Sequence, residues 1–203
     1  MTARRTYAFI ALGRGADPTI AEGTAMGITP DDKDWTWVLG AACPECGYDA
    51  SLIDPRDIAG RVRATVPVYR AALAAGDANV RRSPDRWSTL EYACHVRDVH
   101  RLYAYRLGLM LDLDDPLFPN WDQDETAVAE RYDLQDPAVV ADELAVAADA
   151  IALAYDGVGD RWDRTGRRSD DRAFTVDTFA RYYLHDIEHH AWDITGAPAG
   201  SWL

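Results

Sequence analysis

The chain has 203 residues, 48% of them hydrophobic, and it includes seven Trp and ten Tyr. This length and composition allow one medium-sized domain with a real core and argue against global disorder. The formal net charge is −13. Such an acidic surface repels phosphate backbones, so nucleic acid is not expected as a partner. No apolar run approaches the ~20 residues of a membrane-spanning helix, so we expect no membrane association.

The sequence divides into three segments. Residues 1–34 are rich in Gly, Pro, Asp and Thr without periodicity, which predicts a loose N-terminal extension. Residues 35–53 combine a short apolar run with a Cys-x-x-Cys turn, which predicts a small irregular segment packed on the rest. Residues 54–196 carry mainly helical patterns, with loops between the helices. With three cysteines and no recognisable export signal, the sequence favours a cytoplasmic protein without disulfides.

Two long helices are expected in the first half of the helical segment. The first begins at Asp54-Pro55, where an N-cap side chain is followed by proline. Pro67 lacks an N–H group and should kink or split this helix. The second helix opens at the capping-box sequence Ser88-Thr89-Leu90-Glu91 and runs to about Leu111.

Two further long helices are expected after a loop that includes a short helix over 124–132. Asp136-Pro137 begins the third, and the last runs from near Phe174-Thr175 to a C-cap at Gly196. Between them, residues 159–172 are polar and are predicted to form a loop. Four long amphipathic helices without a convincing set of strands predict an all-α four-helix bundle.

Histidine is scarce in this chain, which has His95, His100, His185, His189 and His190. Residues four apart on a helix differ by about 40° in direction, so His185 and His189 share a face and can bind one metal ion. His190 lies about 100° from that face and is not expected to join them. His95 lies on the inner face of the second helix, and His100 faces elsewhere. The spacing predicts a metal site of His95, His185 and His189, with a hydrogen-bonded core pair as the alternative for the last two.

Three motifs carry a resemblance to a known family. They are Trp87-Ser88-x-x-Glu91-x-x-x-His95-x-x-Asp98, Asn120-Trp121-Asp122-Gln123-Asp124, and Phe174-Thr175-x-x-Thr178 leading to His185-x-x-x-His189. Through them, residues 35–195 resemble the DinB/YfiT-like superfamily, which includes mycothiol-dependent maleylpyruvate isomerase. The resemblance implies an up-down-down-up bundle holding one divalent metal ion with three histidines. These map onto His95, His185 and His189.

The resemblance also implies an activity, since relatives include S-transferases and isomerases that use a low-molecular-weight thiol. We expect a metal-dependent transferase that joins a thiol such as mycothiol to a small electrophilic substrate. The alternatives are a metal-dependent hydrolase or isomerase using metal-bound water, and a non-catalytic metal-binding protein related to stress. Zinc ranks first because it suits both imidazole and sulfur, ahead of nickel, manganese and iron. Assembly into a homodimer is left open.

Carboxylates near the predicted ligands are candidate catalytic groups. Glu91 lies one turn before His95 and Asp98 nearly one turn after it, so either can orient a ligand or move a proton. Asp186 is a further candidate, and ordinary helix-surface charge is the alternative for each. Arg181 either meets an anionic substrate or pairs with a neighbouring carboxylate.

The turn Cys43-Pro44-Glu45-Cys46-Gly47 has the spacing of one zinc-ribbon knuckle. A ribbon needs a second cysteine pair, and Cys94 is the only other cysteine of the chain. Three interpretations stand at this point. The turn is a structural turn or thiol pair, a redox dithiol, or half of a metal site that other residues complete.

Overall fold

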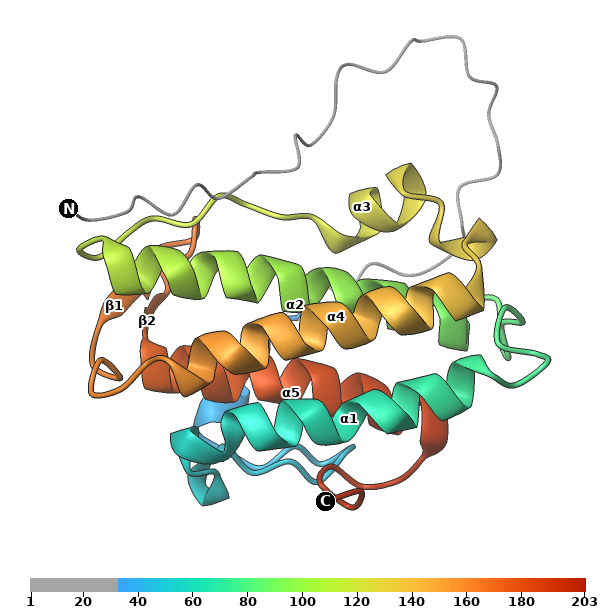
Figure 1. Ribbon diagram of the computed structural model, residues 1–203, viewed down its shortest axis with the longest axis horizontal. Helices are drawn as coiled ribbons and strands as arrows, with labels where there is room; N and C mark the ends of the chain where they lie inside the picture. Colours follow the sequence, from blue (N-terminus) through green and yellow to red (C-terminus); the bar gives the residue numbers. More distant parts are fainter. Residues whose placement is uncertain (1–32) are drawn as a thin grey trace, which may run out of the picture.

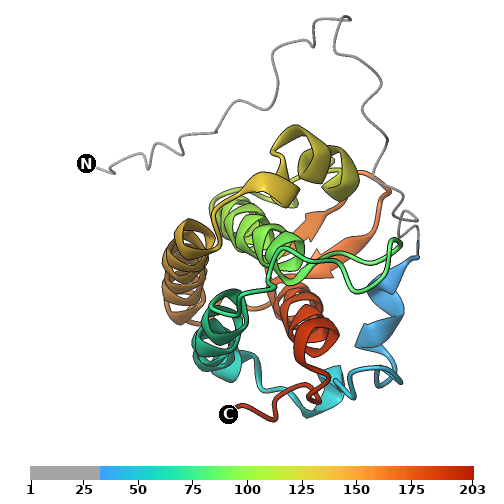
Figure 2. The ribbon, with the colours of Figure 1, turned by 90° about the vertical axis from the view of Figure 1, so that its right-hand side faces the viewer.

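The computed structural model describes residues 33–203, and four long helices form its frame. They are α1 (Ile58–Leu73), α2 (Thr89–Asp112), α4 (Pro137–Asp156) and α5 (Val176–Thr195). Figure 1 shows α1 and α5 running one way along the bundle and α2 and α4 running the other. Each of α1 and α2 packs against both α4 and α5, as the end-on view in Figure 2 shows. The predicted all-α bundle with up-down-down-up order is confirmed.

The ends of the helices follow local signals in the sequence. A reciprocal capping box of Ser88 and Glu91 begins α2. Gly196 ends α5 in the left-handed conformation, with a φ of 73°. The short 3₁₀ helix η3 (Pro55–Asp57) leads into α1, which continues through Pro67 as one helix. Of the kink or split predicted at this proline, the split is therefore wrong.

The parallel direction of α2 and α4 requires a crossover that returns along the length of the bundle (Figure 1). This crossover contains α3 (Gln123–Ala129) and the 3₁₀ helix η4 (Tyr132–Leu134). Before α5, strands β1 (Thr165–Arg167) and β2 (Ala173–Thr175) form a small antiparallel hairpin. The loop predicted over 159–172 contains β1, so that prediction is wrong in this part.

The hairpin holds the start of the crossover. The Phe118 N–H donates to the Arg167 carbonyl at 2.7 Å, and the Arg167 N–H donates to the Pro116 carbonyl at 2.8 Å. Gly166 lies against the same loop, where a Cβ atom would come within 2.6 Å of the Phe118 ring. A larger residue would push this aromatic ring away, so the close approach of hairpin and crossover requires glycine here.

The segment before α1 lies along α5. It contains the 3₁₀ helices η1 (Trp35–Leu39) and η2 (Ala50–Leu52), with the cysteine turn between them. The Tyr48 hydroxyl, which is buried, donates to the Arg181 carbonyl of α5 at 2.8 Å. The loose extension predicted over residues 1–34 lies, except for its last two residues, outside the described part of the chain.

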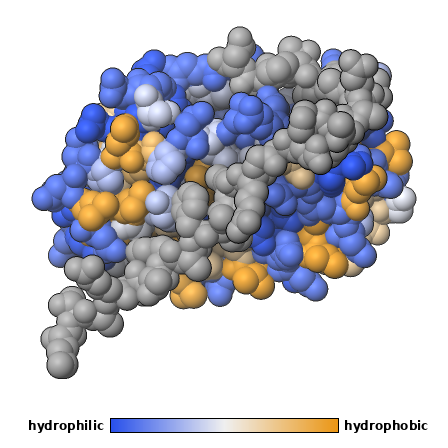
Figure 3. All heavy atoms as spheres, turned by 90° about the horizontal axis from the view of Figure 1, so that it is seen from above, coloured by the Kyte–Doolittle hydropathy of each residue, from blue (hydrophilic) through white to orange (hydrophobic). Residues whose placement is uncertain are grey.

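The helices turn their apolar sides inward and leave a mainly polar surface. The view in Figure 3 shows hydrophilic residues over most of the described surface, with hydrophobic residues in scattered patches. None of the helices in residues 33–203 is long and apolar enough to cross a membrane.

One buried ion pair joins α1 to α5. Arg61 donates to both carboxylate oxygens of Glu188, at 2.9 and 2.7 Å. The Glu188 side chain is fully buried, whereas 17% of the Arg61 side chain is exposed. A buried carboxylate depends on such a partner, because its charge has no water to stabilise it. This pair fixes the position of α5 against α1 close to its histidines.

We expect Arg61→Ala to lower the free energy of unfolding by roughly 3–5 kcal/mol, because it leaves the Glu188 charge buried without its partner. Urea denaturation followed by circular dichroism measures this change. Arg63→Ala is the matched control on the same helix, because Arg63 makes exposed pairs with Asp149 and Asp156. Its loss should cost at most about 1 kcal/mol. Equal effects from both variants would refute the special role of the buried pair.

Candidate metal centre

Helix α5 carries two pairs of candidate ligands that are offset by one residue. A capping box of Thr175 and Thr178 fixes the start of the helix. His185 and His189 form one pair, and Asp186 and His190 form the other. Because one residue turns the helix by about 100°, the two pairs point to different neighbours. The first pair faces the cysteine turn, and the second faces α2.

The pair facing α2 joins His95 to form a group of three, which we call the open site. The Asp186 Oδ1 atom lies 3.4 Å from His95 Nε2 and 3.3 Å from His190 Nε2. A tetrahedral ion with metal–ligand bonds of about 2.1 Å separates its ligand atoms by roughly 3.4 Å. Two imidazoles and one carboxylate are therefore spaced as the ligands of one small divalent ion.

The surroundings hold these groups in the states that a metal ion requires. Burial lowers the pKa of His95, although its contact with Asp186 works against this. Burial alone would raise the pKa of Asp186, but the hydrogen bond and charge of His95 outweigh it and lower the pKa to about 2. Neutral imidazoles and an ionised carboxylate are the ligand forms. Within residues 33–203, the buried Nδ1 of His95 has no hydrogen-bond partner, and Nε2 meets only the Asp186 carboxylate.

Neighbouring side chains orient the rings of the open site. His190 Nδ1 lies 3.0 Å from the Asp193 carboxylate, which leaves Nε2 facing Asp186. A carboxylate on the second ring nitrogen is the usual way to fix a ligand histidine. The His95 ring stacks on Trp121, with ring centres 5.6 Å apart.

Asp186 and His190 face a cavity of about 850 Å³, and His95 is buried beside them. Aromatic side chains make up much of its wall: Trp35, Trp87, Tyr92, Tyr103, Trp121 and Tyr182. Three arginines also line it: Arg86, Arg106 and Arg168. The volume suits a small organic molecule. Aspartates also line the cavity, and Arg86 and Arg168 pair with two of them, Asp193 and Asp170.

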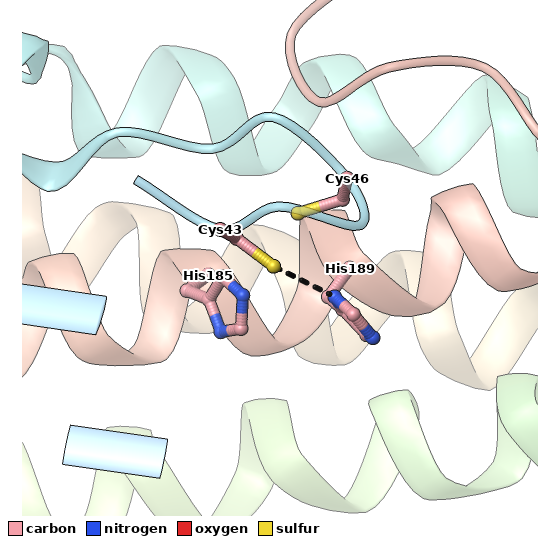
Figure 4. Close-up of side chains that lie close together, drawn as sticks. All are labelled: Cys43, Cys46, His185 and His189. Atoms are coloured by element: carbon pink, nitrogen blue, oxygen red, sulfur yellow. Dashed lines mark hydrogen bonds between the residues drawn. The ribbon is translucent and has the colours of Figure 1, made fainter. Parts of the chain in front are cut away.

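The other pair on α5 joins two cysteines in a second group, which we call the cysteine site. The donor atoms of Cys43, Cys46, His185 and His189 all lie within 4.8 Å of one another, and all four residues are buried. Cys43 Sγ lies 3.7 Å from His189 Nδ1. Figure 4 shows the Cys43 sulfur between the two rings and the Cys46 side chain entering from the turn above.

The three predicted ligands are therefore divided between two groups. The structure brings His185 and His189 together, as predicted, but it places His95 with Asp186 and His190. The cysteine turn occupies the face of α5 that carries His185 and His189, so α2 meets the neighbouring face instead. The signal for this was the Asp186-x-x-x-His190 spacing, which repeats the histidine pair one residue later.

A family model described as the DinB superfamily matches residues 59–194. The chain belongs to the DinB superfamily. Among solved structures, it is similar to YfiT from Bacillus subtilis, which is described as a probable metal-dependent hydrolase with an unusual four-helix bundle topology. The two are 18% identical with a TM-score of 0.62, and the match covers 70% of this chain and 84% of YfiT. No curated protein matches the sequence. At this identity the likeness to YfiT shows the fold alone.

The two predicted catalytic carboxylates of this DinB superfamily member have structural partners. Glu91 is buried and forms an ion pair with Arg81. Asp98 accepts hydrogen bonds from Arg97, Arg101 and Tyr132. Neither carboxylate lines the cavity. The catalytic role predicted for them has no support in this geometry.

Three other polar residues singled out in the sequence lie outside both groups. His100 Nδ1 lies 2.6 Å from the Tyr183 hydroxyl, within the core. Arg181 pairs with Asp177 at 2.7 Å, which is the second of its two predicted roles. Cys94 is a buried, free cysteine.

We expect Glu91→Gln to lower the free energy of unfolding by roughly 1–3 kcal/mol, because Arg81 would then face a neutral amide. Bound metal per chain should not change. Urea denaturation and elemental analysis of the purified variant test the two parts. Glu130→Gln, at an exposed position after α3, is the control and should change neither. A variant that loses its metal but keeps its full stability would instead show that Glu91 belongs to the metal site.

Proposed function

We propose that the open site binds one divalent metal ion and that this protein is a metal-dependent hydrolase of small anionic molecules. The observation that carries the proposal is the convergence of His95, Asp186 and His190 beside a cavity of about 850 Å³. This set consists of two imidazoles and one carboxylate, which is a ligand set of zinc hydrolases. Its spacing, burial and protonation states all fit such an ion.

Three protein ligands leave coordination positions open toward the cavity. A divalent ion held in this way supplies a Lewis acid, which polarises a substrate oxygen and lowers the pKa of water. Zinc ranks first for this set, and iron, manganese and nickel also suit two imidazoles and a carboxylate. YfiT, which shares the fold, is itself described as a probable metal-dependent hydrolase, and this agrees with the proposal.

The residues around the open site prepare it for this chemistry. Asp193 holds the His190 ring through Nδ1, so the ring cannot rotate away from Asp186. Trp121 and Tyr92 cover the His95 and His190 rings and keep water away from their apolar faces. The site is therefore held in place before a substrate arrives.

The position and surroundings of Arg106 are the argument for an anionic substrate. This residue lines the cavity, is 6% exposed, and forms no ion pair with any residue of the described part of the chain. Its Nε is buried without a hydrogen-bond partner there, while another guanidinium nitrogen donates to the Pro119 carbonyl. Burial lowers the pKa of the guanidinium, although arginine stays charged at neutral pH. A carboxylate or phosphate group on the substrate would satisfy both the charge and the free N–H.

The thiol transferase expected from the family resemblance is the second candidate function. The size of the cavity is compatible with this function, because about 850 Å³ has room for a small electrophile together with a thiol. The same metal could then hold a low-molecular-weight thiol such as mycothiol as its thiolate. The two functions differ in whether turnover needs an added thiol.

We expect Asp186→Asn to remove the metal of the open site and with it the hydrolysis of anionic esters and amides such as 4-acetoxybenzoate and N-acetyl amino acids. An amide is a much poorer metal ligand than a carboxylate, while the shape of the side chain is kept. Elemental analysis and a hydrolysis assay with and without zinc are the measurements. Asp177→Asn, in the first turn of the same helix, is the matched control and should keep both metal and activity.

Three results would change the proposal. Metal retained at the open site by Asp186→Asn would remove Asp186 from the ligand set. Turnover that appears only with an added thiol would favour the transferase. A metal-loaded protein that converts none of these substrates, with or without thiol, would favour a non-catalytic metal-binding protein.

We expect the protein to bind benzoate more tightly than neutral benzamide, and Arg106→Met to weaken benzoate binding by about tenfold or more. Methionine keeps much of the apolar packing and removes the charge. Isothermal titration calorimetry measures both ligands. Arg101→Met is the control on α2, because Arg101 already pairs with Asp98 and Glu143. Equal binding of benzoate by the Arg106 variant would exclude this residue as the anion-binding group.

A further inference from the structure

The proposed function leaves the cysteine site unused. Cys43, Cys46, His185 and His189 are all buried, and the structure forms no disulfide between the cysteines. Only 3% of His185 is exposed, and its Nε2 has no hydrogen-bond partner within residues 33–203. Buried polar atoms normally have a partner, so an unsatisfied imidazole nitrogen gathered with two thiols and a second imidazole requires an explanation. We propose that these four side chains bind a second metal ion, zinc, in a closed structural site.

The spacing of the donors fits this ion. Zinc bonds of about 2.3 Å to sulfur and 2.1 Å to nitrogen place the two ligand atoms roughly 3.6 Å apart in a tetrahedron. The distance from Cys43 Sγ to His189 Nδ1 is 3.7 Å. All pairs of donors lie within 4.8 Å, so a small inward movement of the remaining side chains would complete the tetrahedron.

The turn that carries the cysteines is built independently of the histidines. The Gly47 N–H donates to the Cys43 carbonyl at 2.9 Å, and the Cys43 N–H donates to the Tyr48 carbonyl at 2.8 Å. Gly47 has a φ of 76°, which glycine adopts without strain. This geometry points both thiols at the same side of the turn, toward α5 (Figure 4). Two candidate ligands from the turn and two from one face of α5 thus converge on the same point.

The chemistry of the four donors selects zinc and a structural role. Two sulfur and two nitrogen ligands in a tetrahedron are typical of structural zinc. Binding would release the two thiol protons to solvent, and two thiolates would balance the charge of the ion. Four protein ligands leave no position for a substrate, in contrast to the open site. His189 Nε2 faces the Glu45 carboxylate at 3.4 Å, which would orient the ring for binding through Nδ1.

A closed zinc site would fasten the N-terminal segment to α5 and shape the cavity. Trp35 packs on the rings of both His185 and His189, with ring centres 5.5 and 5.1 Å apart. Trp35 is also part of the cavity wall. His185 and His189 line the cavity as well, so an ion that fixes these histidines would hold one wall of it in place.

The test is metal content in matched variants of the full chain. Purified wild-type protein should hold two metal ions per chain by elemental analysis. The double variant Cys43→Ser/Cys46→Ser should lose one of them, and Cys94→Ser, which removes the third buried cysteine, should lose none. Asp186→Asn should lose the other ion only, so failure of the open site and failure of the cysteine site can be told apart.

Cobalt gives a readout that does not depend on the folding of a variant. Wild-type protein stripped of metal and titrated with cobalt(II) should develop a thiolate-to-cobalt charge-transfer band and intense tetrahedral bands. The thermal midpoint should rise with the same stoichiometry. The absence of a thiolate band in wild-type protein would overturn the proposal. Equal metal content in the cysteine double variant and the wild type would do so as well, and so would a Cys43–Cys46 disulfide in the protein purified without oxidant.

Discussion

The register of α5 is the constraint on which the candidate sites depend. Four positions carry candidate ligands, and the helical repeat turns His185 and His189 toward one neighbour and Asp186 and His190 toward another. A shift of this helix by one residue would separate both groups from their partners. Its terminal caps and the buried pair of Glu188 with Arg61, which lies between the two sets, hold that register. Stability and site geometry are therefore determined by the same turn of helix.

Much of the fold could be predicted because its signals are local. Capping boxes, Asp-Pro starts and a terminal glycine mark helix ends within a few residues, and the bundle follows from four apolar stripes. The hairpin of β1 and β2 was missed because each strand has three residues and its pairing depends on contacts with the crossover at Phe118. Pro67 was given too much weight as a helix breaker, since α1 continues through it.

The candidate site was harder to predict, because helical periodicity gives faces but does not say what covers them. The sequence grouped His185 with His189 correctly, and it added His95 because that residue lies on the inner face of another helix, as the family resemblance also implied. Nothing local revealed that the cysteine turn, more than a hundred residues away, would lie on that face. Asp186 was considered as an orienting group and His190 was set aside, although the two repeat the same spacing. Glu91 and Asp98 were chosen for their distance from His95 along α2, but arginines on and near that helix engage them.

The crossover between α2 and α4 is the part of the cavity wall that can vary most, whereas the helices that carry the candidate ligands cannot. Parallel neighbours cannot be joined by a short turn, so this connection travels along the bundle and supplies Asn120, Trp121 and Asp122 to the cavity. It is anchored to the hairpin at one end and contributes no ligand to either metal group. Apart from Trp121, which stacks on His95, the side chains that it presents to the cavity can therefore change with little effect on the candidate ligands. An effort to redirect this scaffold toward other molecules would begin with that connection and leave the four helices as they are.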